Sequence, residues 1–178
     1  YRRCCFGGTE ITIAGIAKGS GMIAPNMATM LAFVFTDARI PASVLRSVHK
    51  ATVDRTFNCI TVDSDTSTSD TVVLAATGQA CNTKPDGISD RVLNSFKQAL
   101  LEVYVELATQ VVKDGEGAKK LISISVKNAK TYLIAKNVAF SIANSLLVKT
   151  LFTSNELNFG RIFMAIGKLN ESIKLPLL

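Results

Sequence analysis

The sequence predicts a layered domain of the α/β or α+β class, in which strands and helices are interleaved along the chain. Some segments carry apolar residues at every second position, which is typical of strands, and others carry them at helical spacing. Nearly half of the 178 residues (48%) are apolar, which is enough to bury one substantial core. No internal repeat or low-complexity segment is present, so we expect one layered domain or part of a larger one.

The first third of the chain predicts two strands joined by an irregular loop. Residues 9–16 alternate in polarity and predict a strand that ends at Gly15. Residues 17–28 contain glycine, proline and asparagine at several positions, all of which interrupt regular structure. An apolar run then covers residues 30–35, so a buried strand is expected to begin at or near Thr29.

The remaining pattern alternates between helices and strands. Asp90 is the expected N-cap of the longest helix, and Lys113 near that helix's end suits the helix dipole. The expected elements are, in order, a helix over 41–57, a loop over 63–70, a strand over 72–76, a turn over 82–87, a helix over 92–115, a strand over 122–126, and helices over 132–144 and 161–168.

Composition and charge argue against several classes of function. The net charge is +6, but the basic residues are scattered, and the chain has no Trp and no spacing typical of a nucleic-acid-binding motif, so no nucleic-acid partner is expected. No apolar run reaches the roughly 18 residues that a membrane span requires. The four cysteines lack the paired spacing of a zinc site. We therefore expect a protein of a reducing, cytoplasmic compartment with no membrane partner and no metal.

The loop before the second strand is the most informative place for chemistry. It would deliver the hydroxyl of Thr29 to the start of a buried strand, directly after the carbonyl group of Ala28. In a strained peptide that hydroxyl can attack this carbonyl, and cleavage would leave Thr29 as a new amino terminus whose own amine can serve as a base. Glycine-bearing loops before strands are more often only turns, and the residues alone favour that simpler interpretation.

Two other features could be mistaken for functional sites. The acidic run over 63–70 has carboxylates at alternating positions, but it lacks the glycine and glutamate of a calcium loop, so we expect a loop shaped by side-chain hydrogen bonds beside the active site. The single histidine, His49, lies among basic residues on a predicted helix. A surface position is expected for it, rather than a catalytic role.

Four ordered motifs resemble the bifunctional ornithine acetyltransferase and glutamate N-acetyltransferase family of arginine biosynthesis, whose members cleave themselves to expose a terminal threonine. The resemblance runs through almost the whole chain, and four motifs in order are far more specific than one glycine loop. The motifs are AKGSGMIAPNMATMLAFVFTD over 17–37, FNCITVDSDTSTSDT over 57–71, KDGEGA over 113–118, and IANS with LVKT over 142–150.

The resemblance implies a role for each matching residue. Thr29 is implied as the acetyl-accepting nucleophile, with cleavage between Ala28 and Thr29. Residues 1–28 would then be the end of the upstream (alpha) chain, and residues 29–178 a downstream (beta) chain that is truncated at its end. Lys18 is implied as the contact to a substrate carboxylate and Glu116 as a substrate-binding residue, whereas outside the family both would be solvated loop charges.

The resemblance also implies a fold, a reaction and partners. The family has an αββα sandwich of the α+β class, of which this chain would form part, in an assembly of two upstream and two downstream chains. It transfers acetyl from N-acetylornithine to glutamate, and some members accept acetyl-CoA as donor; no other cofactor is expected. The family's oxyanion-hole segment and its ending are absent here, which indicates a fragment. Two alternatives stay open: a related self-processing aminopeptidase or amidohydrolase, and an inactive remnant.

Overall fold

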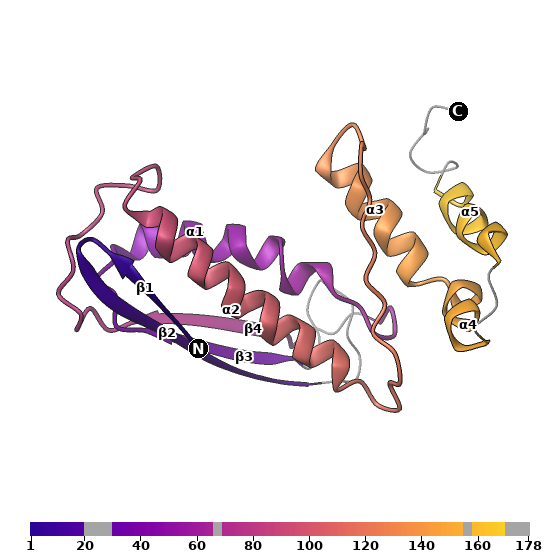
Figure 1. Ribbon diagram of the computed structural model, residues 1–178, viewed down its shortest axis with the longest axis horizontal. Helices are drawn as coiled ribbons and strands as arrows, with labels where there is room; N and C mark the ends of the chain where they lie inside the picture. Colours follow the sequence, from indigo (N-terminus) through magenta and orange to yellow (C-terminus); the bar gives the residue numbers. More distant parts are fainter. Residues whose placement is uncertain (20–29, 66–68, 155–157, 170–178) are drawn as a thin grey trace. The chain divides into compact units, whose positions relative to one another are not determined.

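The computed structural model describes residues 1–19, 30–65, 69–154 and 158–169, which form two compact units, Tyr1–Glu116 and Gly117–Leu178. The first unit combines a sheet with two helices that lie on one face of it (Figure 1). The second unit is helical. The mixed class of helix and strand predicted from the two periodicities is therefore confirmed.

The first unit is built on a four-stranded sheet in the order β1-β2-β3-β4. The strands are β1 (Arg2–Phe6), β2 (Thr9–Lys18), β3 (Leu31–Thr36) and β4 (Thr71–Ala76). The first three pair antiparallel, and β3 pairs parallel with β4. The strands predicted over 9–16, 30–35 and 72–76 are confirmed, and β2 continues two residues further than expected.

The edge strand β1 was not predicted, because its two arginines and two cysteines do not look like a buried strand. It forms a hairpin with β2 through a two-residue turn, Gly7 (φ 57°) and Gly8 (φ 81°), and a type I′ hairpin turn requires positive φ at both of these positions. The guanidinium group of Arg2 lies 3.3 Å from a carboxylate oxygen of Glu102 and 3.0 Å from one of Glu106. Arg2 is thus paired with a neighbouring helix, whereas Arg3 lies 3.7 Å from a carboxylate oxygen of Glu10 in β2.

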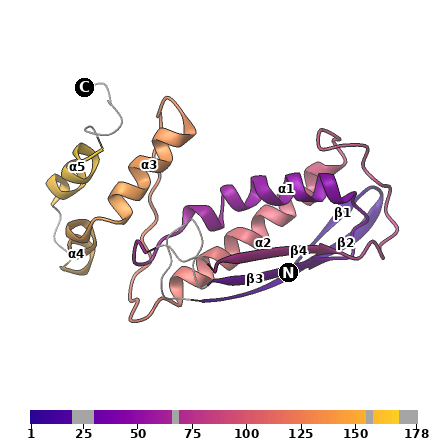
Figure 2. The same cartoon turned by 180° about the vertical axis from the view of Figure 1, so that it is seen from behind.

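Helices α1 (Ala42–Asp54) and α2 (Leu93–Lys113), with the short 3₁₀ helix η1 (Phe57–Cys59), cover the same face of the sheet (Figures 1 and 2). Helix α1 lies in the connection between the parallel strands β3 and β4, which need such a crossover. Both helices were predicted. The expected cap of α2 was wrong by two residues: Asp90 accepts the N–H of Val92 at 3.0 Å, and Val92 is the N-cap residue.

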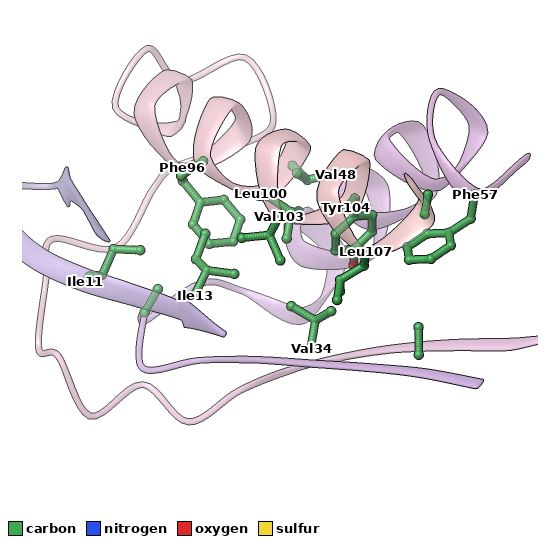
Figure 3. Close-up of a cluster of buried hydrophobic side chains, with 14 of the residues drawn as sticks. Ile11, Ile13, Val34, Val48, Phe57, Phe96, Leu100, Val103, Tyr104 and Leu107 are labelled. Carbon is green, nitrogen blue, oxygen red and sulfur yellow. The ribbon is translucent and has the colours of Figure 1, made fainter. Parts of the chain in front are cut away.

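The core of the first unit lies between α2, α1 and the sheet (Figure 3). Inward-facing residues recur on α2 at three- and four-residue intervals, and on β2 and β3 at alternate positions. Fully burying one such large apolar side chain stabilises the fold by about 1.5–3 kcal/mol. The central members are Ile11, Ile13, Val34, Val48, Phe57, Phe96, Leu100, Val103, Tyr104 and Leu107.

The surface position expected for His49 was wrong, because this side chain is half-buried and bonded on both ring nitrogens. Its Nδ1 lies 2.7 Å from the hydroxyl of Tyr104, and its Nε2 lies 3.1 Å from the carbonyl oxygen of Val72. A carbonyl can only accept, so Nε2 carries the hydrogen and Nδ1 accepts from the tyrosine. His49 therefore ties α1 to both α2 and β4.

The second unit contains α3 (Tyr132–Ala143), α4 (Leu146–Ser154) and α5 (Phe159–Gly167) around a small core of Ile142, Val148 and Ala165. The hydroxyl of Thr131 caps α3 by accepting the N–H of Ile134 at 3.2 Å. Helix α4 was not predicted. The strand expected over 122–126 is wrong: within the described chain this segment has no ladder partner, and its alternating burial belongs to a single extended stretch.

Candidate active site

Three chain segments meet at one end of the sheet. In the strand register, Lys18 at the end of β2 lies opposite Leu31 at the start of β3, and Leu31 lies opposite Thr71 at the start of β4. Ala28 and Thr29, the predicted cleavage site and nucleophile, lie outside the described residues. The chain nevertheless resumes at Met30, the residue bonded to Thr29, at this same end of the sheet.

Lys18 is the last residue of β2, and its side chain is exposed. Successive strand residues point to opposite faces, and Ala17 packs against the core under the helices, so Lys18 projects from the other face of the sheet. The next residue, Gly19, has φ 115°, a conformation that favours glycine. The chain therefore turns out of the strand directly after the lysine.

Helix α2 runs in the same direction as β2 along the sheet. Near the hairpin, the ring of Phe96 packs on that of Phe6, with ring centres 5.6 Å apart. Further along the same helix, Leu107 lies against Gly15 of β2. In Figure 3 the labelled residues of α2 run in order from Phe96 to Leu107 alongside Ile11, Ile13 and Val34 of the strands. The end of α2 therefore points to the end of β2.

Glu116 follows α2 and reaches that same end of the sheet. The last residue of α2 lies six helical steps after Leu107, a rise of about 9 Å, and Lys18 lies three strand steps after Gly15, a rise of about 10 Å. Glu116 is exposed, three residues beyond the helix end. Among the described residues no ion pair joins Glu116 to Lys18, so the structure places two opposite charges at one end of the fold without direct contact.

Met30 is held at three points. Its N–H donates to Oδ1 of Asp70 at 2.6 Å, and its carbonyl oxygen accepts the N–H of Thr71 at 3.0 Å. Its side chain is only 4% exposed and belongs to the core. The start of β3, immediately after the predicted nucleophile, is therefore a rigid part of the fold.

Asp70 is the residue of this end of the sheet that sequence reasoning missed. The sequence pattern predicts only that it belongs to the acidic loop over 63–70, with no role of its own. Its side chain is half-buried and bonds a backbone group 40 positions away. The available signal was its place directly before a predicted strand, but which strand lies alongside cannot be read from that position.

The described part of the acidic loop has the side-chain bonding that was predicted for it. Oδ1 of Asp63 accepts the N–H of Asp65 at 3.0 Å, and Ser64 between them has φ 73°.

Within the described segments, no group of three or more His, Cys, Asp or Glu side chains could hold a metal ion. No helix in the same segments is long and apolar enough to cross a membrane.

The charges at this end of the sheet suit an amino-acid ligand. An ammonium group such as that of Lys18 can bind an α-carboxylate, and a carboxylate such as that of Glu116 can bind an ammonium group. Both side chains are exposed and thus accessible to a small molecule.

Comparisons with known proteins agree on one family. Residues 1–176 match the sequence model of the ArgJ family. The chain is 52% identical over 164 residues to the arginine biosynthesis bifunctional protein ArgJ of Gluconobacter oxydans (strain 621H), covering 92% of this chain and 39% of that protein. The protein of the same name from Caulobacter vibrioides (strain ATCC 19089 / CIP 103742 / CB 15) is 49% identical over 173 residues, covering 97% of this chain and 43% of that protein.

A solved structure has the same fold. The crystal structure of the arginine biosynthesis bifunctional protein argJ from Bacillus halodurans matches with a TM-score of 0.73 and 45% sequence identity, over 78% of this chain and 65% of that one. The chain described here spans about two-fifths of the length of the curated relatives it matches.

Proposed function

The chain belongs to the ArgJ family, and from that membership we propose that it is part of an enzyme that transfers an acetyl group between amino acids in arginine biosynthesis. The donor is N-acetylornithine and the acceptor is glutamate, with acetyl-CoA as a second possible donor. The observation that carries the proposal is the immobilised Met30: the chain enters β3 from Thr29 at the sheet end where Lys18 and Glu116 present their charges.

Self-cleavage makes the catalyst in the first step. The hydroxyl oxygen of Thr29 attacks the carbonyl carbon of Ala28, the peptide C–N bond breaks, and an ester forms. Water then hydrolyses the ester, which leaves a carboxylate on Ala28 and a free α-amine on Thr29. The firm anchoring of Met30 supports this step, because a peptide can be distorted only against a part of the fold that does not yield.

Acetyl transfer follows as two displacements. The α-amine of Thr29 accepts the hydroxyl proton as the oxygen attacks the acetyl carbonyl of N-acetylornithine, and ornithine leaves with that proton on its amine. The acetyl group is then held as an ester on Thr29. The amine of glutamate attacks this ester, N-acetylglutamate leaves, and the threonine hydroxyl is restored.

Lys18 and Glu116 orient the substrates in this scheme. Ornithine and glutamate both carry an α-carboxylate, which Lys18 binds, and Glu116 binds an ammonium group of ornithine. The exposure of both side chains supports these roles, because neither charge is consumed by an ion pair within the described segments.

The outer face of the sheet supports the αββα sandwich. Ile16, Phe33 and Val73 lie side by side across three strands, on the face opposite the helices, and are 69%, 37% and 36% exposed. Phe35, also on this face, is 50% exposed. A row of large apolar side chains on an open sheet face is what a second sheet would cover. The assembly of two upstream and two downstream chains that the resemblance implies stays a prediction.

The test is intact mass spectrometry of the full chain, with amino-terminal sequencing and a search for acetyl-Thr29 after incubation with N-acetylornithine. We expect a new terminus reading Thr-Met-Leu, an acetylated peptide beginning at Thr29, and neither in Thr29→Ala. An uncut chain would refute self-processing. Release of free acetate without an acceptor would instead favour the amidohydrolase alternative.

A further inference from the structure

We propose that Asp70 is a positioning residue for Thr29, acting through the backbone of Met30. This inference deepens the proposed function and rests on it. The Oδ1 atom of Asp70 accepts the N–H of Met30 at 2.6 Å, and that N–H belongs to the peptide bond that joins Met30 to Thr29. A carboxylate 40 positions along the chain thus holds the nucleophile's own peptide group.

The peptide bond transmits this contact to the nucleophile. The amide nitrogen of Met30 and the carbonyl carbon of Thr29 lie in one planar unit, so a bond that holds the N–H also holds the plane through which Thr29 is attached. Rotation about the backbone next to Thr29 would otherwise spread its hydroxyl and amine over many orientations. Holding reacting groups in place is worth several powers of ten in rate, and a misplacement of about 1 Å can cost on the order of 100-fold.

The bond from Asp70 is placed where the sheet itself offers no equivalent. The ladder with β4 begins one step later, where the N–H of Thr71 donates to the carbonyl oxygen of Met30 at 3.0 Å. A half-buried carboxylate makes a shorter and stronger bond to an N–H than a neutral acceptor does. Both peptide groups of Met30 are therefore held by consecutive residues of one segment.

That segment is itself braced against the helices. Two residues beyond Asp70, the carbonyl oxygen of Val72 accepts a hydrogen bond from Nε2 of His49 at 3.1 Å, and Nδ1 of His49 is bonded to Tyr104. Tyr104 is fully buried in the core. The position of Asp70 is therefore determined by α1 and α2 as well as by the sheet.

A second aspartate provides a matched control. Oδ1 of Asp37, directly after β3, accepts the N–H of Thr12 in β2 at 2.8 Å. The two bonds join the same chemical groups, but the Asp37 bond lies six strand residues away from the start of β3 and touches no residue next to Thr29. Removing either carboxylate shows how much the hydrogen bond contributes to the stability of the fold. Only the removal of Asp70 shows how much the bond contributes to the reactivity of Thr29.

The experiment compares Asp70→Ala, Asp70→Asn and Asp37→Ala in the full chain. The rate of cleavage at Thr29 is followed by intact mass, kcat and KM are measured for the cleaved enzyme, and urea unfolding reports stability. We expect Asp70→Ala to slow cleavage and lower kcat by about 10- to 100-fold, with KM for both amino acids changed by less than about threefold. Asp70→Asn, which keeps an acceptor oxygen, should recover most of the rate, and Asp37→Ala should lose stability without a comparable loss of kcat.

Three outcomes would overturn the inference, and they are distinguishable. Equal losses in Asp70→Ala and Asp37→Ala would mean that the bond serves only the fold. A loss in Asp70→Asn as large as in Asp70→Ala would mean that the carboxylate acts by its charge, and the positioning account would fail. If the unsubstituted chain stays uncut, the proposed function fails, and the role of Asp70 falls with it.

Discussion

Gly15 sets the distance between β2 and α2, and replacing it with alanine should destabilise the first unit. A methyl group at this position would lie 2.8 Å from Cγ2 of Val34, 2.9 Å from Cδ1 of Leu107 and 3.2 Å from the carbonyl oxygen of Phe33. Carbon atoms pack at about 3.5–4.0 Å, so the side chains must move, and the carbonyl oxygen belongs to a paired strand that cannot yield easily.

The magnitude follows from two opposing effects. Overpacking a core position typically costs about 1–3 kcal/mol. Alanine is better than glycine inside a strand by roughly 0.5–1 kcal/mol, because it loses less backbone freedom on folding. The net loss for Gly15→Ala is therefore about 0–2.5 kcal/mol, centred near 1 kcal/mol, and a loss of about 1 kcal/mol lowers a urea midpoint by about 0.5 M for an m-value near 2 kcal/mol/M.

Urea titration combined with hydrogen exchange of peptides from β2 and α2 would measure this loss in the first unit separately from the second. Gly87→Ala is the matched control, because no atom lies within 4 Å of a methyl group there and its φ is not left-handed. That change should leave stability equal or raise it by about 0.4–1 kcal/mol. A gain in stability for Gly15→Ala as large as that for Gly87→Ala would refute the reasoning that this contact sets the spacing of helix and sheet.

Three further predictions concern the half-buried histidine and the exposed charges. Tyr104→Phe leaves Nδ1 of His49 without its donor, so the unfolding free energy should fall by about 1–3 kcal/mol, and an unchanged urea midpoint would contradict the bond. Burial lowers the pKa of His49, opposed by the bond to Val72, so its contribution to stability is complete above about pH 6.5 and is lost as pH falls toward the folded-state pKa. Urea midpoints measured from pH 7.5 to 5 should fall less in His49→Gln than in the unsubstituted chain. Lys18→Ala and Glu116→Gln should each raise KM by about 10-fold or more with a smaller effect on kcat, and steady-state kinetics showing the reverse would remove them from substrate binding.

The sequence predicted those features that depend on the spacing of residues within one element of secondary structure. The period-two pattern in β2 and the helical pattern in α2 show which side of each element is buried. The spacing of the buried residues in turn indicates whether the element is a strand or a helix. The four motifs likewise identified the family that the comparisons show. The roles of Lys18, Thr29 and Glu116 were inferred from this resemblance and stay predictions. Where the local pattern was misleading, as over 122–126, an alternating segment has no strand beside it among the described residues.

Only the tertiary structure decided which distant residues meet. Strand β1 returns to β2 through a two-glycine turn, and its Arg2 lies beside two carboxylates of α2, whereas Arg3 lies beside Glu10 of β2. The burial of His49 depends on α1, α2 and β4 coming together, and the bond between Asp70 and Met30 depends on the parallel pairing of β3 with β4. The contacts of Arg2, His49 and Asp70 each join residues far apart in the chain. The sequence around a donor or an acceptor is the same whether or not a distant partner lies within about 3 Å of it, so these contacts cannot be predicted locally.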